Sequence, residues 1–180
     1  MAEIYDIALQ SIDGAATSLS TYQGKVLLVV NVASKCGLTP QYEGLQKLYT
    51  EKHAAGLEVL GFPANDFRGQ EPGTEAEIAS FCSTKYDVSF PLFSKISVVG
   101  EAQHPLYKSL VAAQPKAEGG DTMRTKLQGY GMTPNPEPEV LWNFEKFLIG
   151  RDGAVIGRFT PDTTADSPVL LAAIDKALAA

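Results

Sequence analysis

The stretch KVLLVVNVASKCGLTPQ, residues 25–41, decides the fold class. Its run from Val26 to Val32, apolar and largely β-branched except for Asn31, indicates a strand that is covered on both faces, as in the interior of a layered α/β sheet. Cys36 follows where this strand stops. Chemistry in open α/β sheets gathers at the carboxyl ends of the strands, and we therefore regard Cys36 as a candidate reactive residue.

The residues after Cys36 predict a helix that begins close to the thiol. Thr39 has the properties of an N-cap and Pro40 those of a first helical residue, and Gly56 is expected to close the segment. The positive end of the helix dipole, together with Lys35, would favour a thiolate over a thiol. Most cysteines are nevertheless unreactive core residues, and on pattern alone that alternative stays open.

Composition and charge limit the classes of function. The 180-residue chain is 44% hydrophobic, and we expect one domain over residues 1–180 that needs no disulfide or metal. A net charge of −6 argues against a nucleic-acid partner or an anionic membrane surface. We recognise no secretory signal and no apolar run of transmembrane length, and we expect a cytoplasmic protein. Two cysteines in a reducing compartment favour a transient catalytic disulfide.

The order of the elements is that of an α/β thioredoxin fold with additions. Residues 5–24 predict an N-terminal hairpin, and the apolar run 57–64 predicts a second strand, parallel to the first. A helix is expected over 74–86, where Thr74 and Glu77 fit a capping box. Apolar runs on both sides of 151–153 predict an antiparallel hairpin, and residues 167–180 a terminal helix.

The structure of one long segment and the position of the second cysteine are harder to predict from the pattern. Residues 114–139 are rich in Pro and Gly with almost no periodicity, so we expect an inserted surface loop. In the helix over 74–86, Ile78, Phe81 and Cys82 fall on one face, which favours a core position for Cys82.

A thioredoxin-like redox motif is incomplete in this chain. Where Cys-x-x-Cys is expected, residues 36–39 read CGLT, so the site is better suited to attack an oxidant than to shuttle a local disulfide. Four blocks resemble the glutathione peroxidase family, in its selenium-free, cysteine-containing branch. They are NVASKCGLTPQY (31–42), GFPANDFRGQEPG (61–73), FCSTKYDVSFPLF (81–93) and WNFEKFLIGRDG (142–153).

The resemblance implies roles for individual residues. Cys36 corresponds to the peroxidatic nucleophile and Gln70, Trp142 and Asn143 to its catalytic partners. Neutral N–H donors of these types can stabilise both a thiolate and the charge on a leaving oxygen, and no metal or cofactor is implied. Many members carry Cys-Asn-Gln at residues 64–66, where this chain has Asp66. An acid pointing at the thiol would raise the thiol pKa, so its orientation matters.

The resemblance also implies a second thiol and a reductant. Cys82 corresponds to the resolving cysteine, which forms a disulfide with Cys36 that thioredoxin then reduces. From a helix core face, Cys82 would start beyond the Cα separation of about 7 Å that a disulfide tolerates, so the helix would have to unwind locally.

We therefore expect a thiol peroxidase that reduces hydrogen peroxide and organic hydroperoxides with electrons from thioredoxin. A glutathione-dependent peroxidase is an alternative, although Cys82 argues against it. A non-enzymatic sensor that passes Cys36–Cys82 oxidation to a partner protein would use the same residues. A lipid-surface binding module is a third class, motivated only by scattered apolar residues. The sequence leaves the oligomeric state open.

Overall fold

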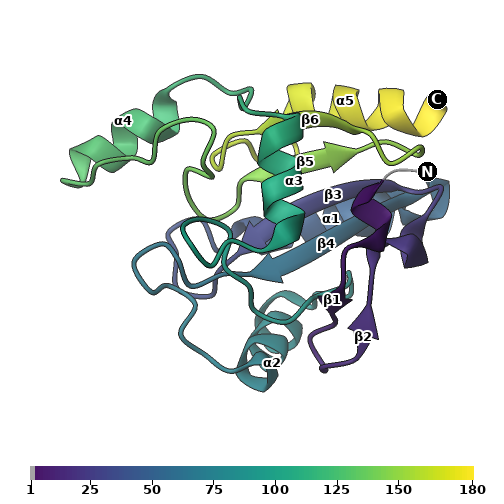
Figure 1. The fold of residues 1–180 in the computed structure, drawn as a ribbon, viewed down its shortest axis with the longest axis horizontal. Helices are drawn as coiled ribbons and strands as arrows, with labels where there is room; N and C mark the ends of the chain where they lie inside the picture. The colour runs from purple at the N-terminus through teal and green to yellow at the C-terminus, as the bar shows by residue number, and fades with distance from the viewer. Residues whose placement is uncertain (1–2) are drawn as a thin grey trace.

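The central strand of the protein is β3 (Val26–Val32), which is buried along its whole length in the computed structural model, where residues 3–180 are described. The strand pairs in parallel with β4 and antiparallel with β5, and β5 pairs antiparallel with β6, which gives the order β4-β3-β5-β6 (Figure 1). The other strands of this sheet are β4 (Leu57–Pro63), β5 (Lys146–Ile149) and β6 (Val155–Phe159). The predicted interior strand, its parallel neighbour and the later hairpin are confirmed.

Helices cover both faces of this sheet (Figure 1). The α-helices of the described chain are α1 (Gln41–Lys52), α2 (Glu75–Tyr86), α3 (Pro105–Ala113), α4 (Thr122–Gly129) and α5 (Pro168–Ala179), of which α4 does not cover the sheet. The 3-10 helices are η1 (Glu3–Asp6), η2 (Leu19–Tyr22) and η3 (His53–Ala55). Successive residues of β3 alternate between the two faces. Val26 and Leu28 pack in one core with α1, α2 and α5, whereas Leu27 and Val29 pack in the other with α3. The side chains of β3 therefore contribute to the hydrophobic cores on both faces of the sheet.

The flanking elements largely match the sequence. The N-terminal hairpin pairs β1 (Leu9–Gln10) with β2 (Ala16–Thr17) as a separate small sheet, and Gly14 supplies a left-handed turn conformation at φ 90°. Helix α2 begins with a complete capping box, in which the Glu77 backbone N–H donates to the Thr74 side chain and the Thr74 N–H to the Glu77 carboxylate. Within the described part of the chain, no helix has the length and apolarity needed to cross a membrane.

The predicted start of α1 is wrong. The helix begins at Gln41 with Pro40 as its N-cap. The Thr39 hydroxyl instead accepts the Cys36 backbone N–H at 2.9 Å and donates to the Ala33 carbonyl at 2.8 Å. Because Thr39 uses its side chain to close the turn after β3, a short run of turns separates Cys36 from the first helical residue.

The prediction of a structureless insertion over 114–139 is also wrong in part. The insertion contains α4, which stands apart from the sheet (Figure 1). Met123 and Leu127 lie one helical turn apart and are buried against Leu141, beside the partly buried Trp142. Glycines and prolines on both sides masked this short apolar pair in the sequence.

Candidate active site

Cys36 lies in the loop between β3 and α1, and this loop is fastened to a second loop over residues 65–73. The Ser34 backbone N–H donates to the Glu71 carboxylate at 3.1 Å, and the Lys35 N–H donates to the Gln70 carbonyl at 3.0 Å. The second loop follows the neighbouring strand β4, so both loops leave the same edge of the sheet. These bonds place Gln70 against the residues that carry the thiol.

The Cys36 thiol is nearly enclosed, with 9% of the residue exposed. The backbone N–H of Leu38 points at its sulfur at 3.3 Å. An N–H donor in this position stabilises negative charge on sulfur, as a nucleophilic thiol requires. The local turn therefore supplies a stabilising dipole in place of the helix terminus that the sequence suggested.

Trp142 and Asn143 are held against the end of β3 by the buried Asn31. The Asn31 side chain donates to the Trp142 carbonyl at 3.1 Å, and the Asn31 carbonyl accepts the Phe144 N–H at 2.6 Å. Phe144 adopts a positive φ of 68°, an uncommon conformation for a bulky residue. Such backbone conformations persist only where their surroundings hold them, and they cluster at functional sites.

Asn143 and Gln70 are joined by a direct side-chain contact. The Asn143 amide N–H donates to the Gln70 side-chain oxygen at 2.9 Å. Because this bond occupies the Gln70 oxygen, it fixes the orientation of the Gln70 amide and leaves its NH₂ group available for another acceptor. Asn143 itself is completely buried.

A cavity of about 320 Å³ unites most of these residues. Cys36, Gln70 and Trp142 line it, and Asn143 reaches it through its bond to Gln70. The rest of the wall is apolar except for two cations. It consists of Gly37, Leu38, Met123, Leu127, Tyr130 and Met132, with Arg68 and Lys126. Neither Arg68 nor Lys126 forms an ion pair within residues 3–180, so the cavity is cationic at those side chains although the chain is acidic.

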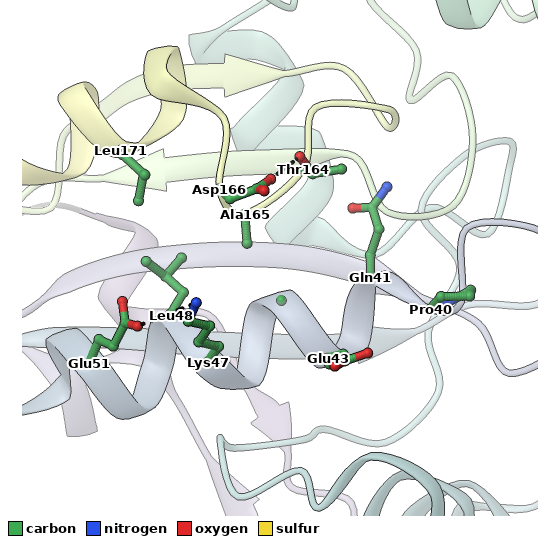
Figure 2. Close-up of a pocket in the computed structure, with 11 residues that line it drawn as sticks. Pro40, Gln41, Glu43, Lys47, Leu48, Glu51, Thr164, Ala165, Asp166 and Leu171 are labelled. Carbon is green, nitrogen blue, oxygen red and sulfur yellow. Dashed lines mark hydrogen bonds and ion pairs between the residues drawn. The ribbon is translucent and has the colours of Figure 1, made fainter.

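A larger groove of about 510 Å³ lies elsewhere, between α1 and the α5 side of the molecule (Figure 2). Ala165 and Leu171 face Leu48 across it. Its charged lining residues are Glu43, Lys47, Glu51 and Asp166. None of the predicted site residues lines this groove. We therefore locate the candidate active site in the smaller cavity, where the thiol is.

Cys82 is a free thiol in the core face of α2, with no exposed surface. The pKa of the Cys82 thiol is raised to about 11, mainly by burial and to a smaller extent by the charge of Glu71. The Tyr42 hydroxyl, which faces the sulfur, opposes the rise. In this state Cys82 is protonated at neutral pH and is therefore a poor nucleophile.

The Asp66 carboxylate does not point at the thiol. It accepts the Ser97 hydroxyl and the Val98 backbone N–H, both at 2.7 Å. Both partners belong to the segment before α3. Asp66 therefore braces a loop on the far side of β4 from Cys36.

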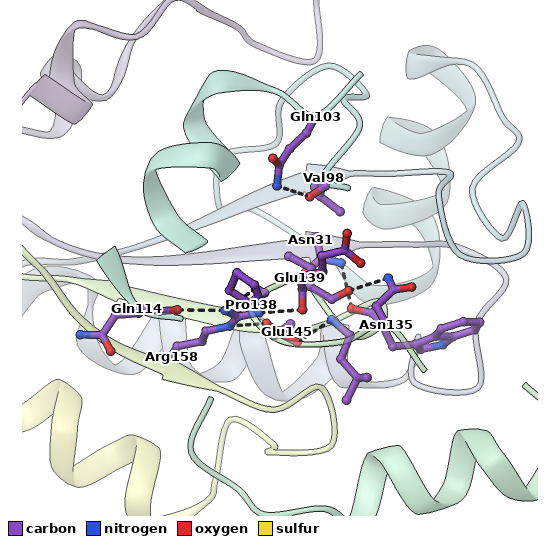
Figure 3. A network of polar contacts seen from close by, with 12 residues as sticks. Asn31, Val98, Gln103, Gln114, Asn135, Pro138, Glu139, Glu145 and Arg158 are labelled. Carbon is purple, nitrogen blue, oxygen red and sulfur yellow. Dashed lines mark hydrogen bonds and ion pairs between the residues drawn. The ribbon is translucent and has the colours of Figure 1, made fainter. Parts of the chain in front are cut away.

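A buried arginine anchors the segment that leads into Trp142 (Figure 3). Arg158 on β6 pairs with Glu145 at 2.6 Å, and Glu145 accepts the Leu141 backbone N–H at 2.9 Å. The Arg158 guanidinium also donates to the carbonyls of Gln114, Pro138 and Glu139 at 2.8–3.0 Å. This network joins both ends of the 114–141 segment to the sheet.

Sequence reasoning missed three contributors to the site. Thr39 closes the Cys36 turn, Arg68 and Lys126 supply the charge of the cavity, and α4 supplies its apolar wall. The four-residue spacing of Met123 and Leu127 was a usable signal for α4. Among residues 3–180, no group of three or more His, Cys, Asp or Glu side chains is placed to hold a metal ion.

The chain is similar to known peroxidases over most of its length. A family model described as glutathione peroxidase matches residues 4–111. The chain is 48% identical over 178 residues to the thioredoxin/glutathione peroxidase BtuE of Escherichia coli (strain K12), which covers 98% of this chain and 97% of the relative.

Solved structures support the same assignment. A crystal structure of Trgpx in apo form is 36% identical, with a TM-score of 0.71 and coverage of 98% of this chain and 95% of that one. A thioredoxin-family thiol:disulfide interchange protein from Chlorobium tepidum TLS is 12% identical, covers 96% and 92% of the two chains, and has a TM-score of 0.59, which shows a shared thioredoxin fold. The chain belongs to the glutathione peroxidase family.

Proposed function

We propose that Cys36 is the nucleophile of this thiol peroxidase. Membership of the family makes the chain a peroxidase that reduces hydroperoxides. The Cys36 thiolate attacks one peroxide oxygen, the O–O bond breaks, and Cys36 becomes a sulfenic acid. The leaving oxygen takes up the proton that the thiol gave up on ionisation and departs as water or an alcohol. The observation that carries this proposal is the cavity in which Cys36 meets Gln70 and Trp142, with Asn143 bonded to Gln70.

The neighbouring donors stabilise the charge that develops in this step. Bond cleavage places negative charge on the leaving oxygen, and a preorganised N–H donor lowers the cost of that charge. Gln70 offers its free amide NH₂ and Trp142 its indole N–H, while Asn143 fixes Gln70. The apolar wall of α4 suits the organic body of an alkyl hydroperoxide.

Cys82 then resolves the sulfenic acid, and thioredoxin reduces the resulting disulfide. A second free thiol supports this step, and the printed name of the Escherichia coli relative includes thioredoxin as well as glutathione. The cytoplasm, whose reducing poise keeps both thiols reduced between turnovers, is the compartment we propose.

The test is peroxide consumption by the purified full chain, with thioredoxin and glutathione measured side by side. We expect faster turnover with thioredoxin and a Cys36–Cys82 disulfide in the mass spectrum of the oxidised protein. Cys36→Ser should abolish turnover with either reductant, because a hydroxyl remains protonated near neutral pH.

Cys82→Ser is the matched control. It should keep the first oxidation of Cys36 and then over-oxidise, since no internal thiol condenses with the sulfenic acid. Appreciable turnover by folded Cys36→Ser would refute the assignment of the nucleophile. A free Cys82 beside an oxidised Cys36 in the parent would refute the resolving role.

A further inference from the structure

The Thr39 hydroxyl makes both of its hydrogen bonds within the turn that carries the thiol. It accepts the Cys36 backbone N–H at 2.9 Å and donates to the Ala33 carbonyl at 2.8 Å. A hydroxyl has one proton to donate, and the Ala33 carbonyl takes it. Thr39 therefore has no proton left for the Cys36 sulfur and can influence the thiol only through the backbone of the turn.

A backbone bond joins the same two residues. The Thr39 N–H donates to the Cys36 carbonyl at 3.1 Å, so Cys36 and Thr39 are linked in both directions across a four-residue turn. Because Ala33 directly follows β3, the Thr39 hydroxyl also ties this turn to the end of the central strand. Only 5% of Thr39 is exposed, so water has little access to compete for these bonds.

Leu38 lies inside this turn, and its N–H points at the Cys36 sulfur at 3.3 Å. A side chain that accepts the N–H two residues ahead has the geometry of an Asx turn, with sulfur here in place of oxygen. The Leu38 carbonyl accepts the Gln41 N–H at 2.9 Å, which joins the turn to the start of α1. The contact of the Leu38 N–H with the sulfur thus depends on the backbone shape that the Thr39 bonds hold.

We propose that Thr39 is a positioning residue for the peroxidatic thiol, because its hydroxyl holds the turn in the shape that keeps the Leu38 N–H on the Cys36 sulfur. This inference rests on the proposed function, in which Cys36 attacks the peroxide. The Leu38 N–H stabilises the thiolate, and the thiolate is the form that reacts. Thr39 acts on the protonation of the nucleophile and does not touch the peroxide.

Removal of the hydroxyl would leave two buried backbone groups without their partner. The Cys36 N–H and the Ala33 carbonyl both bond to Thr39. A buried polar group without a partner is costly, so the turn would relax until these groups found other partners. Such a change would move the Leu38 N–H away from the sulfur and disfavour the thiolate.

Other titratable or charged groups border the Cys36 loop or its cavity. They are Lys35, Arg68, Glu71, Glu77, Lys126 and Tyr130. Tyr42 and Cys82 pack in the same core as Cys36, and burial raises the pKa of both, so both stay protonated near neutral pH. A substitution of Thr39 removes none of these groups, so it isolates the effect of the hydroxyl on the turn.

The test compares Thr39→Val, which keeps the branched shape without the hydroxyl, with Thr39→Ser, which keeps the hydroxyl. Every protein also carries Cys82→Ser, so that Cys36 is the only thiol. Iodoacetamide alkylation of Cys36, followed by mass spectrometry as the pH is varied, reports the thiolate fraction. The midpoint of this profile should lie about one pH unit higher in Thr39→Val than in the Cys82→Ser parent, as expected for the loss of a hydrogen bond to a charged group. Thr39→Ser should restore the parent profile.

Oxidation by hydrogen peroxide, followed as loss of the Cys36 thiol in quenched samples, gives the second readout. Below the midpoint, Thr39→Val should react about threefold to tenfold more slowly than the parent, because less thiolate is present. Above the midpoint its rate should reach or exceed that of the parent, since a less stabilised thiolate is the stronger nucleophile. A merely structural loosening of the site would instead lower the rate by the same factor at every pH.

Thr50→Val is the matched control, because Thr50 is an exposed residue of α1 whose hydroxyl donates to the Gln46 carbonyl. It should match the parent in both readouts. Thr39→Ala, which also lacks the hydroxyl, replaces Thr39→Val if the valine variant does not fold.

Two results would overturn this inference and leave Cys36 as the nucleophile. One is a hydroxyl-free variant with the alkylation profile and oxidation rates of the parent, and the other is a loss of rate by the same factor at every pH. If the Cys82→Ser parent kept its Cys36 thiol in the presence of peroxide, the proposed function would be overturned as well.

Discussion

At the scale of single residues, Gln70 and Asn143 carry the same functional group but contribute differently. Asn143 is completely buried and its amide N–H donates to the Gln70 side-chain oxygen, whereas Gln70 lines the Cys36 cavity with a free NH₂ group. The chain positions of the two residues differ by 73. We infer that Gln70 meets the reacting oxygen and that Asn143 acts by holding the Gln70 amide in one orientation.

Gln70→Ala should therefore slow the oxidation of Cys36. Removing one preorganised donor to a developing anion costs about 10²–10³-fold, and we expect a loss of that order in the second-order rate with peroxide. Stopped-flow mixing on folded protein measures it. Gln23→Ala, at an exposed glutamine without a side-chain hydrogen bond among the described residues, is the control. Equal rates for Gln70→Ala and the parent would exclude Gln70 from the reaction.

At the scale of elements, the segment before Trp142 depends on Arg158 more than on its own secondary structure. Arg158 is 3% exposed, and its guanidinium donates hydrogen bonds to the Glu145 carboxylate and to three backbone carbonyls (Figure 3). A planar guanidinium offers five N–H donors in a fixed fork, which an ammonium group does not reproduce. A buried charge pair is also costly to break, because the remaining partner is left uncompensated.

Arg158→Lys should lower stability and disturb the active site together. Lysine keeps a charge beside Glu145 but cannot reach all three carbonyls, and a buried carbonyl left without a donor costs about 1–3 kcal/mol. We expect a loss of at least that order in the free energy of unfolding, measured by urea denaturation. The Trp142 emission should shift towards longer wavelength as the indole becomes more exposed, and Cys36 oxidation should slow.

Arg124→Lys provides a graded comparison, since the Arg124 guanidinium makes one hydrogen bond within residues 3–180, to the Asn135 carbonyl at 2.8 Å, and is partly exposed. Its loss should stay near 1 kcal/mol. If Arg158→Lys retained the parent's emission and oxidation rate, the segment would be held by its other contacts.

At the scale of the whole molecule, the sequence predicts the parts of the fold that follow from local pattern. An apolar run covered on both faces identified β3, and the capping box identified the start of α2. The start of α1 could not be found in this way, because Thr39 bonds backward to the Cys36 turn instead of forward into the helix. The Gln70–Asn143 contact likewise depends on the packing of two loops, one after β4 and one before β5, which lie on opposite sides of β3 in the sheet, and no local spacing encodes it.

The contacts of Lys146 also depend on the packing of the whole molecule. The sequence shows only a lysine in an apolar strand and does not indicate which groups it contacts. Its ammonium group is fully buried and donates to the Gln41 side chain at 2.6 Å and the Pro161 carbonyl at 2.9 Å, joining β5 to α1 and to the segment after β6. Burial lowers the pKa of Lys146 to about 7, although Asp162 and Glu145 oppose the shift.

The stability of the protein should consequently rise between pH 7 and 9. In that window the unfolded chain keeps the Lys146 proton, with an ordinary pKa of 10.5, while the folded chain releases it. Whenever the unfolded state binds more protons, stability increases with pH, and one proton contributes a slope of up to about 1.4 kcal/mol per pH unit. The raised pKa values of Glu71 and Glu145 have the opposite effect. Because the folded state holds these protons more tightly than the unfolded state, the stability of the protein falls as the pH rises from about 4.5. Urea denaturation of the parent and Lys146→Met at several pH values measures the difference, and Lys146→Met should lose the upward slope whatever its stability at pH 7. An equal slope in both proteins would mean that Lys146 stays charged in the core, stabilised by Gln41, Pro161 and Asp162.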